Sequence, residues 1–184
     1  MSPVPDFLAL RGARTDADGI ADFGNPAGEW AAAATGAVVA DASSTGVLVA
    51  AGADAAAFLH GQLSSDVKRL ARGEGVWTSY NSPKGRMLAT AFIYRPDVGP
   101  EDRFEALVAA DIAAAVRKRL AMFVLRSKVT LADDTAAWLR LGVGGPAAAA
   151  AVAQALGGVP PSGGVVTRDG ARIVRLPDGR LLVL

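Results

Sequence analysis

The sequence contains no cysteine among its 184 residues. This absence excludes disulfide bonds, thiolate metal sites and a thiol nucleophile within the chain. Histidine occurs once, as His60, and no group of residues has the spacing of a metal site. Ser64 follows at helical i, i+4 spacing, but no acidic residue stands at an equally suggestive place and no Gly-x-Ser-x-Gly elbow is present. We therefore expect no catalytic Ser–His pair.

Strong charge of one sign and long apolar runs are also missing. The formal net charge is +1, which is too balanced to predict non-specific nucleic-acid binding. No window reaches the roughly 20 uninterrupted apolar residues of a membrane helix, and the N-terminus lacks the pattern of a signal peptide. Hydrophobic residues make up 51% of the chain, which excludes a disordered protein. These features predict a cytoplasmic protein that contacts neither nucleic acid nor membrane directly.

Hydrophobic periodicity and turn residues predict an α+β fold. An extended arm over residues 1–24 precedes a helix over 25–35. The pattern then predicts a strand, a helix, two paired strands, a further strand, a helix and a strand, over residues 46–50, 55–63, 76–80, 88–94, 103–109, 111–124 and 127–131. This order resembles a split βαβ, or ferredoxin-like, unit with one extra strand.

An internal repeat indicates a second unit. Residues 47–63 and 139–156 both read as strand, glycine turn and alanine-rich helix, with Gly52 aligned on Gly144 and Gln62 on Gln154. Short strands follow over 164–167, 171–176 and 180–184, and no helix or final strand comes after them. We therefore expect an arm and helix over 1–40, a first unit over 41–135 and an incomplete second unit over 136–184. Its last strand would leave an exposed edge able to pair with another chain, as in a piece of a longer protein.

The strongest functional signal is a hairpin turn between two strand-like runs, Asn81-Ser82-Pro83-Lys84-Gly85-Arg86-Met87. Lys84 and Arg86 on such a turn suit an anionic ligand, because cations bind carboxylates through charge-assisted hydrogen bonds. A solvated basic turn is the alternative.

The other candidate ligand contacts also have structural alternatives. Gln62 and Asn81 can each contact a ligand or hydrogen-bond the nearby backbone. Asp66 can orient an amine of a ligand, cap the following turn or pair with a cation. Tyr80 and Trp77 can stack on a ring or lie in the core. Arg126 and Lys128 alternate at the start of the strand predicted over 127–131, so both point to one face. They can extend the basic surface that Lys84 and Arg86 form.

Several of these residues fall in ordered motifs. The segment 58–67, with Gly61-Gln62 and Asp66-Val67, resembles a signature of the YgfZ-like folate-binding proteins, relatives of the glycine-cleavage T-protein. Pro83-Lys84-Gly85-Arg86-Met87 matches the next marker of that family, and residues 123–129 match a third. The resemblance covers nearly the whole chain.

The resemblance implies two intertwined ferredoxin-like units of the T-protein-like fold, the second incomplete. It also implies a tetrahydrofolate site, with Gln62, Asp66, Tyr80, Asn81, Lys84, Arg86 and Arg126 as the candidate contacts. Family members support iron–sulfur cluster assembly or repair and, through it, tRNA modification, so iron–sulfur proteins are the expected partners. The family's Lys-Gly-Cys-aromatic-x-Gly-Gln-Glu motif is missing, so we expect weak folate binding by this chain.

Two alternative functions remain at this point. One is an aminomethyltransferase of the T-protein type, but Leu88-Ala89 replace the acidic pair of those enzymes, so no residue there can polarise the folate amine. The other is a protein-interaction scaffold that does not bind folate. Enzymatic activity is therefore not expected.

Overall fold

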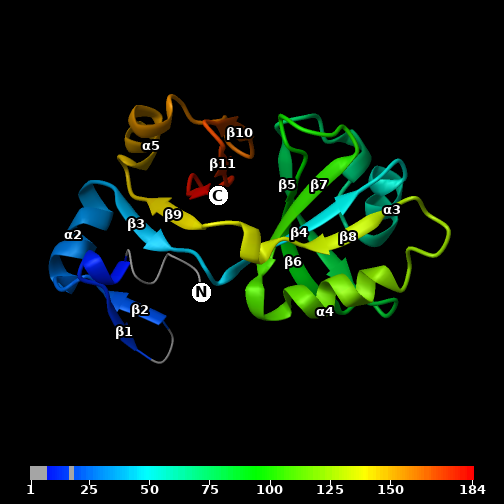
Figure 1. Cartoon of the computed structure of the whole chain (residues 1–184), viewed down its shortest axis with the longest axis horizontal. Coiled ribbons are helices and arrows are strands. Elements are labelled where there is room, and N and C mark those ends of the chain that lie inside the picture. Colours follow the sequence, from blue (N-terminus) through cyan, green and yellow to red (C-terminus); the bar gives the residue numbers. More distant parts are fainter. Residues whose placement is uncertain (1–7, 17–18) are drawn as a thin grey trace.

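Two five-stranded sheets organise the chain, and a small two-stranded sheet lies near its N-terminus. The structure is a computed structural model, and it describes residues 8–16 and 19–184 (Figure 1). The arm predicted over residues 1–24 therefore lies partly outside the described residues. Within it, β1 (Arg14–Asp16) and β2 (Gly19–Asp22) form the two-stranded antiparallel sheet.

The first large sheet has the strand order β5-β6-β7-β4-β8. Its strands are β4 (Thr45–Ala51), β5 (Gly75–Asn81), β6 (Met87–Tyr94), β7 (Arg103–Ala109) and β8 (Thr130–Asp133). The helices α3 (Ala55–Gln62) and α4 (Ala110–Ala121) cover one face, where Phe58 and Leu120 join the apolar core. Two 3-10 turns, η1 (Val67–Arg69) and η2 (Thr135–Ala137), lie in the connections. The predicted ferredoxin-like unit is thus present.

The second large sheet has the order β10-β11-β12-β9-β3. Its strands are β3 (Val38–Asp41), β9 (Leu141–Gly144), β10 (Val165–Arg168), β11 (Ala171–Arg175) and β12 (Leu181–Val183). Helix α5 (Ala148–Leu156) packs on its outer face through Val152. Because β3 precedes the first unit in the sequence but pairs with β9, the two units are intertwined, as expected.

The glycine turns of the internal repeat have the same geometry in both units. Ala55 donates its N–H to the carbonyl of Gly52, and Ala148 donates to that of Gly145. Both glycines have positive φ, 128° and 97°, and a Cβ on either would come within 2.5 Å of a backbone oxygen of the neighbouring strand connection. The repeat is therefore real, but Gly52 corresponds to Gly145, one residue beyond the position that the sequence alignment gave.

The C-terminal strand does not form an exposed edge, contrary to the prediction. β12 pairs with β11 on one side and with β9 on the other, so it lies inside the sheet. The helix and strand that were expected to follow it have counterparts earlier in the chain. The edge strand β3 takes the place in the second sheet that β8 takes in the first, and the helix α2 (Pro26–Thr35) precedes β3 in the chain as α4 precedes β8.

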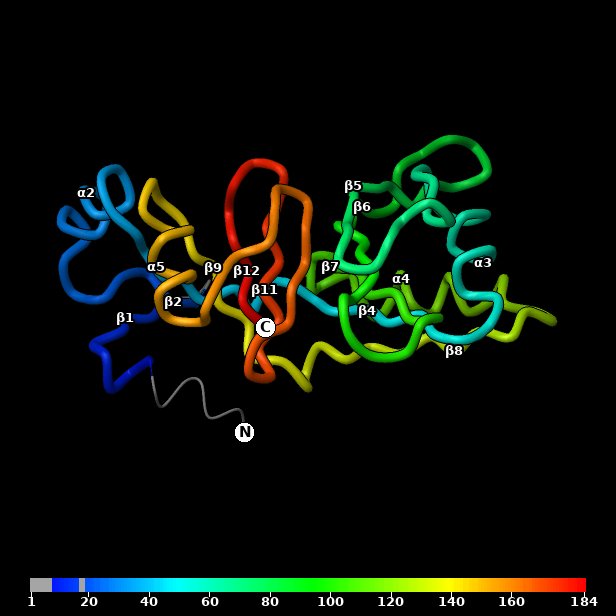
Figure 2. The backbone as a smooth tube through the Cα atoms, turned by 90° about the horizontal axis from the view of Figure 1, so that it is seen from above, coloured from blue at the N-terminus to red at the C-terminus, as the bar shows by residue number. Residues whose placement is uncertain are grey.

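The inner faces of the two large sheets pack against each other. Their shared apolar cluster includes Phe92 and Leu107 from the first sheet and Val174 and Leu182 from the second. The two views agree that β10 to β12 lie between the N-terminal elements and the first sheet (Figure 1 and Figure 2). Among the described residues, no helix is long and apolar enough to cross a membrane.

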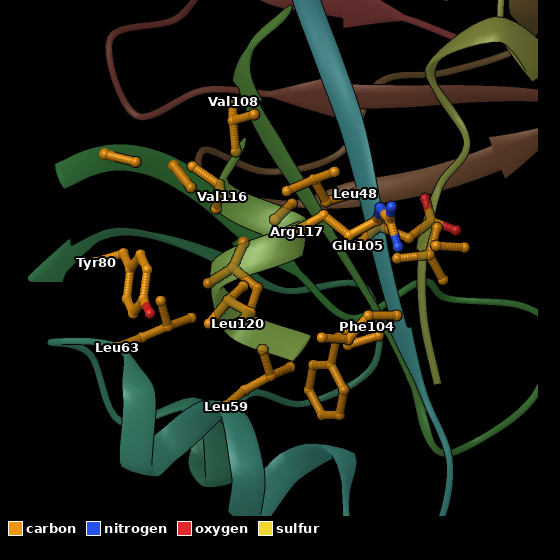
Figure 3. A pocket seen from close by; sticks show the side chains of 18 residues that line it. Leu48, Leu59, Leu63, Tyr80, Phe104, Glu105, Val108, Val116, Arg117 and Leu120 are labelled. Atoms are coloured by element: carbon orange, nitrogen blue, oxygen red, sulfur yellow. The ribbon is translucent and has the colours of Figure 1, made fainter. Parts of the chain in front are cut away.

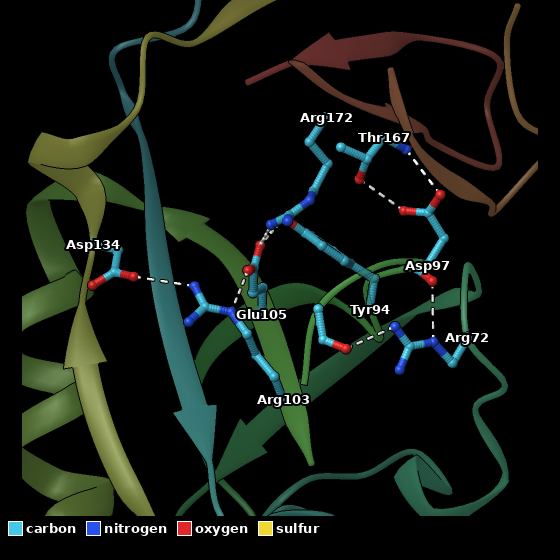
Figure 4. A network of polar contacts seen from close by, with 9 residues as sticks. Arg72, Tyr94, Asp97, Arg103, Glu105, Asp134, Thr167 and Arg172 are labelled. Carbon is cyan, nitrogen blue, oxygen red and sulfur yellow. Dashed lines mark hydrogen bonds and ion pairs between the residues drawn. The ribbon is translucent and has the colours of Figure 1, made fainter. Parts of the chain in front are cut away.

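A buried polar network crosses this interface (Figure 4). Glu105 of β7 is fully buried and accepts hydrogen bonds from Tyr94 Oη at 2.6 Å and from Arg103 Nε at 2.7 Å. Arg172 of β11 reaches across and pairs with the same carboxylate. Burial alone would raise the pKa of Glu105, but the hydrogen bond from Tyr94, the charge of Arg172 and the hydrogen bond from Arg103 hold that pKa below its ordinary value. The carboxylate is therefore charged and ties the two sheets together.

Candidate ligand-binding site

A hollow of about 550 Å³ opens between the inner faces of the two sheets. Trp77, Thr90 and Phe92 line it from β5 and β6, and Arg180 and Leu182 line it from the second unit. Strand alternation explains this set, because successive side chains of a strand point to opposite faces. The hollow is bordered by both repeated units, so its shape depends on how the two sheets pack.

An aromatic surface faces this hollow. The indole of Trp77 is 47% exposed and meets the ring of Phe92 edge-on, with centroids 5.5 Å apart and an interplanar angle of 73°. Phe92 itself is fully buried and fixes the position of its partner. A half-exposed, supported indole beside a polar side chain such as Thr90 is suited to stack on a flat heteroaromatic ring.

The predicted cations lie at the end of the same two strands. The turn between β5 and β6 is closed by bonds from Ser82 N to Arg86 O at 2.8 Å and from Gly85 N to Ser82 O at 2.9 Å. Ser82 Oγ also accepts from Arg86 N at 3.1 Å. Lys84 and Arg86 are exposed and make no ion pair within the described residues. They do not line the hollow; they lie on the turn at the end of β5 and β6.

The segment after α3 lies beside the end of β5. Leu63 and Tyr80 form an antiparallel bridge, and Ser64 N donates to Ser79 O at 3.0 Å. This register brings Gln62 and Asn81 to the same end of the sheet. Asn81 Nδ2 donates to Ser79 Oγ at 3.0 Å, so part of its hydrogen-bonding capacity is used within β5.

Asp66 pairs with His60, whose Nδ1 lies 3.1 Å from Asp66 Oδ1. Helical spacing does not predict this acidic partner for His60, because the two residues meet only where the chain turns after α3. Both side chains are about half exposed, at 42% and 49%. Asp66 makes no side-chain bond to the turn that follows it, so the cap considered above is not formed.

The side chain of Tyr80 faces the helix-covered core and Arg126 lies in the loop after α4, so neither side chain joins this group. Tyr80 is buried, and it borders a cavity of about 40 Å³ between the first sheet and its helices (Figure 3). That volume has room for water and none for a folate. Arg126 is exposed in the loop after α4. The strand expected near Arg126 and Lys128 begins only at Thr130, so these two residues do not alternate on a strand.

A β-bulge lies at Leu88 and Ala89, the positions at which the T-protein signature has an acidic pair. The register shifts between Tyr80 and Asn81, so that Tyr80 faces Ala89 while Asn81 faces Met87. Leu88 and Ala89 consequently both pack into the core beneath the first sheet. The position therefore offers neither a carboxylate nor access to the hollow.

Sequence reasoning missed Thr90, Phe92 and Arg180 as wall residues. The alternation of side chains along the strand predicted over 88–94 places Thr90 and Phe92 on the same face, which could have predicted both as wall residues. Arg180 follows a turn, and its guanidinium binds Asp178 through Nε at 2.9 Å and Nη2 at 2.6 Å. Nothing local in the sequence connects that turn with β6. Among the described residues, no cluster of potential metal ligands was found.

Comparison with known proteins adds family information. Residues 22–160 match the family model described as the GCVT N-terminal domain. An uncharacterized protein of Haemophilus influenzae is 40% identical over 92 residues, which are 50% of this chain and 31% of that protein. The mitochondrial iron-sulfur cluster assembly factor IBA57 homolog of Neurospora crassa is 34% identical over 83 residues, which are 44% of this chain and 19% of that protein.

Solved structures share the fold. The glycine cleavage system aminomethyltransferase T from Bartonella henselae superposes with a TM-score of 0.83 at 19% identity, covering 99% of this chain and 52% of that one. A heterotetrameric sarcosine oxidase from Corynebacterium gives a TM-score of 0.56 at 16% identity, covering 88% and 83%. The predicted T-protein-like fold is thus confirmed. The matches span about half of the aminomethyltransferase and less than a third of the two curated relatives.

Proposed function

This chain belongs to the GCVT N-terminal domain family, and on that premise we propose that it is a non-catalytic, tetrahydrofolate-binding accessory factor of iron–sulfur cluster assembly or repair. The observation that carries the proposal is the arrangement on one hairpin. An aromatic hollow lies along β5 and β6, and two exposed cations stand at their turn.

The arrangement suits an elongated ligand with a flat ring at one end and carboxylates at the other. From Trp77 to Asn81 the strand advances about 13 Å, and Lys84 and Arg86 follow within the turn. We propose that the pterin lies in the hollow against Trp77 and that the glutamyl carboxylates meet Lys84 and Arg86 through charge-assisted hydrogen bonds. Asn81, Gln62 and Asp66 lie at this end of the sheet and would contact the polar edges of the ligand.

Aminomethyl transfer is disfavoured by the same geometry. General acid–base assistance needs a carboxylate within hydrogen-bond reach of the reacting amine. Leu88 and Ala89 supply none and face the core. The Asp66 carboxylate is paired with His60, 3.1 Å from its Nδ1. Glu105 is buried and already accepts from Tyr94, Arg103 and Arg172. Asp41 at the hollow wall accepts two hydrogen bonds from Ser43, at 3.0 and 2.7 Å.

The iron–sulfur role rests on family relationship. The Neurospora relative is named as an iron–sulfur cluster assembly factor. A YgfZ-like placement, a link to tRNA modification and a cytoplasmic location are part of the same proposal, and iron–sulfur proteins would be the partners. We expect folate to bind weakly to this chain, because the matched aminomethyltransferase has roughly as much chain again beyond the shared fold.

Titration calorimetry with tetrahydrofolate tests the proposal. We expect weak binding to this chain and tighter binding to any longer form encoded with it. The double variant Lys84→Ala/Arg86→Ala should weaken binding at least tenfold in whichever form binds, because each lost charged hydrogen bond contributes about 1.5–3 kcal/mol. Arg168→Ala, which removes an exposed cation elsewhere, is the matched control and should change little. Unchanged affinity in the double variant would refute the site, and no binding by either form would favour the scaffold alternative.

A further inference from the structure

An exposed apolar surface lies at the C-terminal end of α4. Three large apolar side chains follow this helix and face solvent: Met122 is 59% exposed, Phe123 41% and Leu125 88%. Contiguous exposed apolar side chains mark interaction sites more often than scattered ones do. Together with Lys118, Arg119 and Arg126 these residues are called the α4 patch below.

The backbone at this surface is strained. Leu125 has φ of 45°, a left-handed conformation that leucine rarely adopts. The residue therefore combines an unfavourable backbone with almost complete exposure of an apolar side chain. Neither property stabilises the fold, and such strain gathers at sites that bind. The loop is nevertheless anchored, because Lys128 N donates to Asp54 Oδ2 at 2.7 Å and Ser127 N to Val124 O at 2.8 Å.

The patch is basic, because its three cations outnumber the one carboxylate beside them, Asp54. Lys118, Arg119 and Arg126 make no ion pair within the described residues. Arg119 Nε is buried without a hydrogen-bond partner. Lys118 and Met122 are four residues apart, as are Arg119 and Phe123, so the cations and the apolar side chains lie next to each other along the helix end.

A shallow hollow of about 750 Å³ lies within the patch, lined by Phe123, Leu125, Arg126 and Asp54 among others. We propose that the α4 patch docks a short acidic segment of a partner protein, with a bulky apolar side chain of that segment seated in the hollow. The unpaired cations provide the charge complementarity for its carboxylates. Aromatic residues, methionine and arginine are also the side chains enriched at protein interfaces.

The geometry favours a peptide over a lipid surface or a nucleic acid. The hollow can receive a protruding side chain, and the patch presents methionine, phenylalanine and arginine, residue types that are enriched at protein–protein interfaces. The proposal does not depend on folate binding, because the α4 patch shares no residue with the hollow between the sheets.

Peptide selection tests this proposal directly. Random twelve-residue peptides displayed on phage would be selected on the intact chain and counter-selected on the Leu125→Gly variant. Glycine adopts the positive φ freely, so this variant keeps the fold and removes only the side chain. We expect enrichment of sequences with Asp or Glu flanking Leu, Phe or Met. Enrichment without acidic residues, or none above the input library, would overturn the proposal.

The most enriched peptide would then be measured by fluorescence anisotropy. We expect Leu125→Gly and the pair Lys118→Gln/Arg126→Gln each to weaken binding about tenfold, and the charge pair also to reduce the salt dependence. Leu10→Gly is the matched control, because Leu10 is 86% exposed elsewhere on the surface; it should leave binding unchanged. Tighter binding of anionic vesicles or of a single-stranded oligonucleotide, lost in the same variants, would assign the patch to those ligands and refute the peptide.

Discussion

Replacing Glu105 by glutamine should sharply destabilise the protein. The carboxylate is fully buried and holds Tyr94, Arg103 and Arg172. Glutamine keeps the shape but removes the charge, and Arg172, only 8% exposed, is left without its counterion. Breaking a buried ion pair in this way costs about 3–5 kcal/mol. Because domains are stable by only about 5–15 kcal/mol, Glu105→Gln should remove at least about a fifth of the total stability.

Urea unfolding followed by tryptophan fluorescence measures this loss. Trp138 is a suitable reporter, because the guanidinium of Arg172 lies 5.0 Å from its ring centroid. Tyr94→Phe is the graded control, since it removes one hydrogen bond to the carboxylate and should cost about 1.5–3 kcal/mol. The double variant Glu105→Leu/Arg172→Met should regain part of the stability, because it removes both buried charges.

The pH dependence gives an independent check. The pKa of Glu105 lies below its ordinary value of 4.5 in the folded protein. The carboxylate therefore contributes stability that is fully present above pH 4.5 and is lost as the pH falls through the folded pKa. Glu105→Gln should flatten this acid limb. A destabilisation under about 1 kcal/mol, with an unchanged acid limb, would refute the view that this network holds the sheets together.

Further predictions concern the glycine turns, the hydrogen bonds between Thr167 and Asp97, and the α4 patch. Gly52→Ala and Gly145→Ala should each cost at least about 2 kcal/mol in urea unfolding, because of positive φ and close backbone contact, whereas Gly61→Ala in α3 should stabilise by about 0.5–1 kcal/mol. Burial alone would raise the pKa of Asp97, but hydrogen bonds from Thr167 hold that pKa below 3.8. Asp97→Asn should therefore lower the stability of the protein above pH 3.8. Equal stability of the variant and the unmodified protein at pH 7 would contradict this. Leu125→Gly should raise the melting temperature slightly, by relieving about 1 kcal/mol of backbone strain, and a lower value would show that the side chain supports the fold.

Local patterns were sufficient for most elements but not for their assembly. The helix predicted over 55–63 is observed as Ala55–Gln62, and the hairpin around Lys84 forms as expected. The helix predicted over 111–124 ends earlier, at Ala121, and continues only as turns. β3 was missed, because four residues of an edge strand carry little periodic signal and its partner β9 lies about 100 residues further along the sequence.

The candidate site was predictable in part for the same reason. Turn residues and charge identified Lys84 and Arg86, which depend only on the local hairpin. Tyr80 was assigned to the ligand on aromatic character, but the face of a strand on which a residue lies is decided by the tertiary packing of both faces. The bulge beside Tyr80 shifts the register of β6, and no local signal in the sequence announces it.

The position of β3 has a consequence for the hollow itself. β3 leaves the N-terminal elements, completes the second sheet and leads directly into β4 of the first, so the second sheet, unlike the first, cannot be completed by a contiguous part of the chain. Glu105 and Arg172 then connect the inner faces of sheets that already share a strand connection. Loop-closure entropy opposes such non-local pairing until several contacts form together. The hollow between the sheets is therefore a property of the fully assembled chain, and a ligand that binds both walls would stabilise the whole assembly rather than one unit.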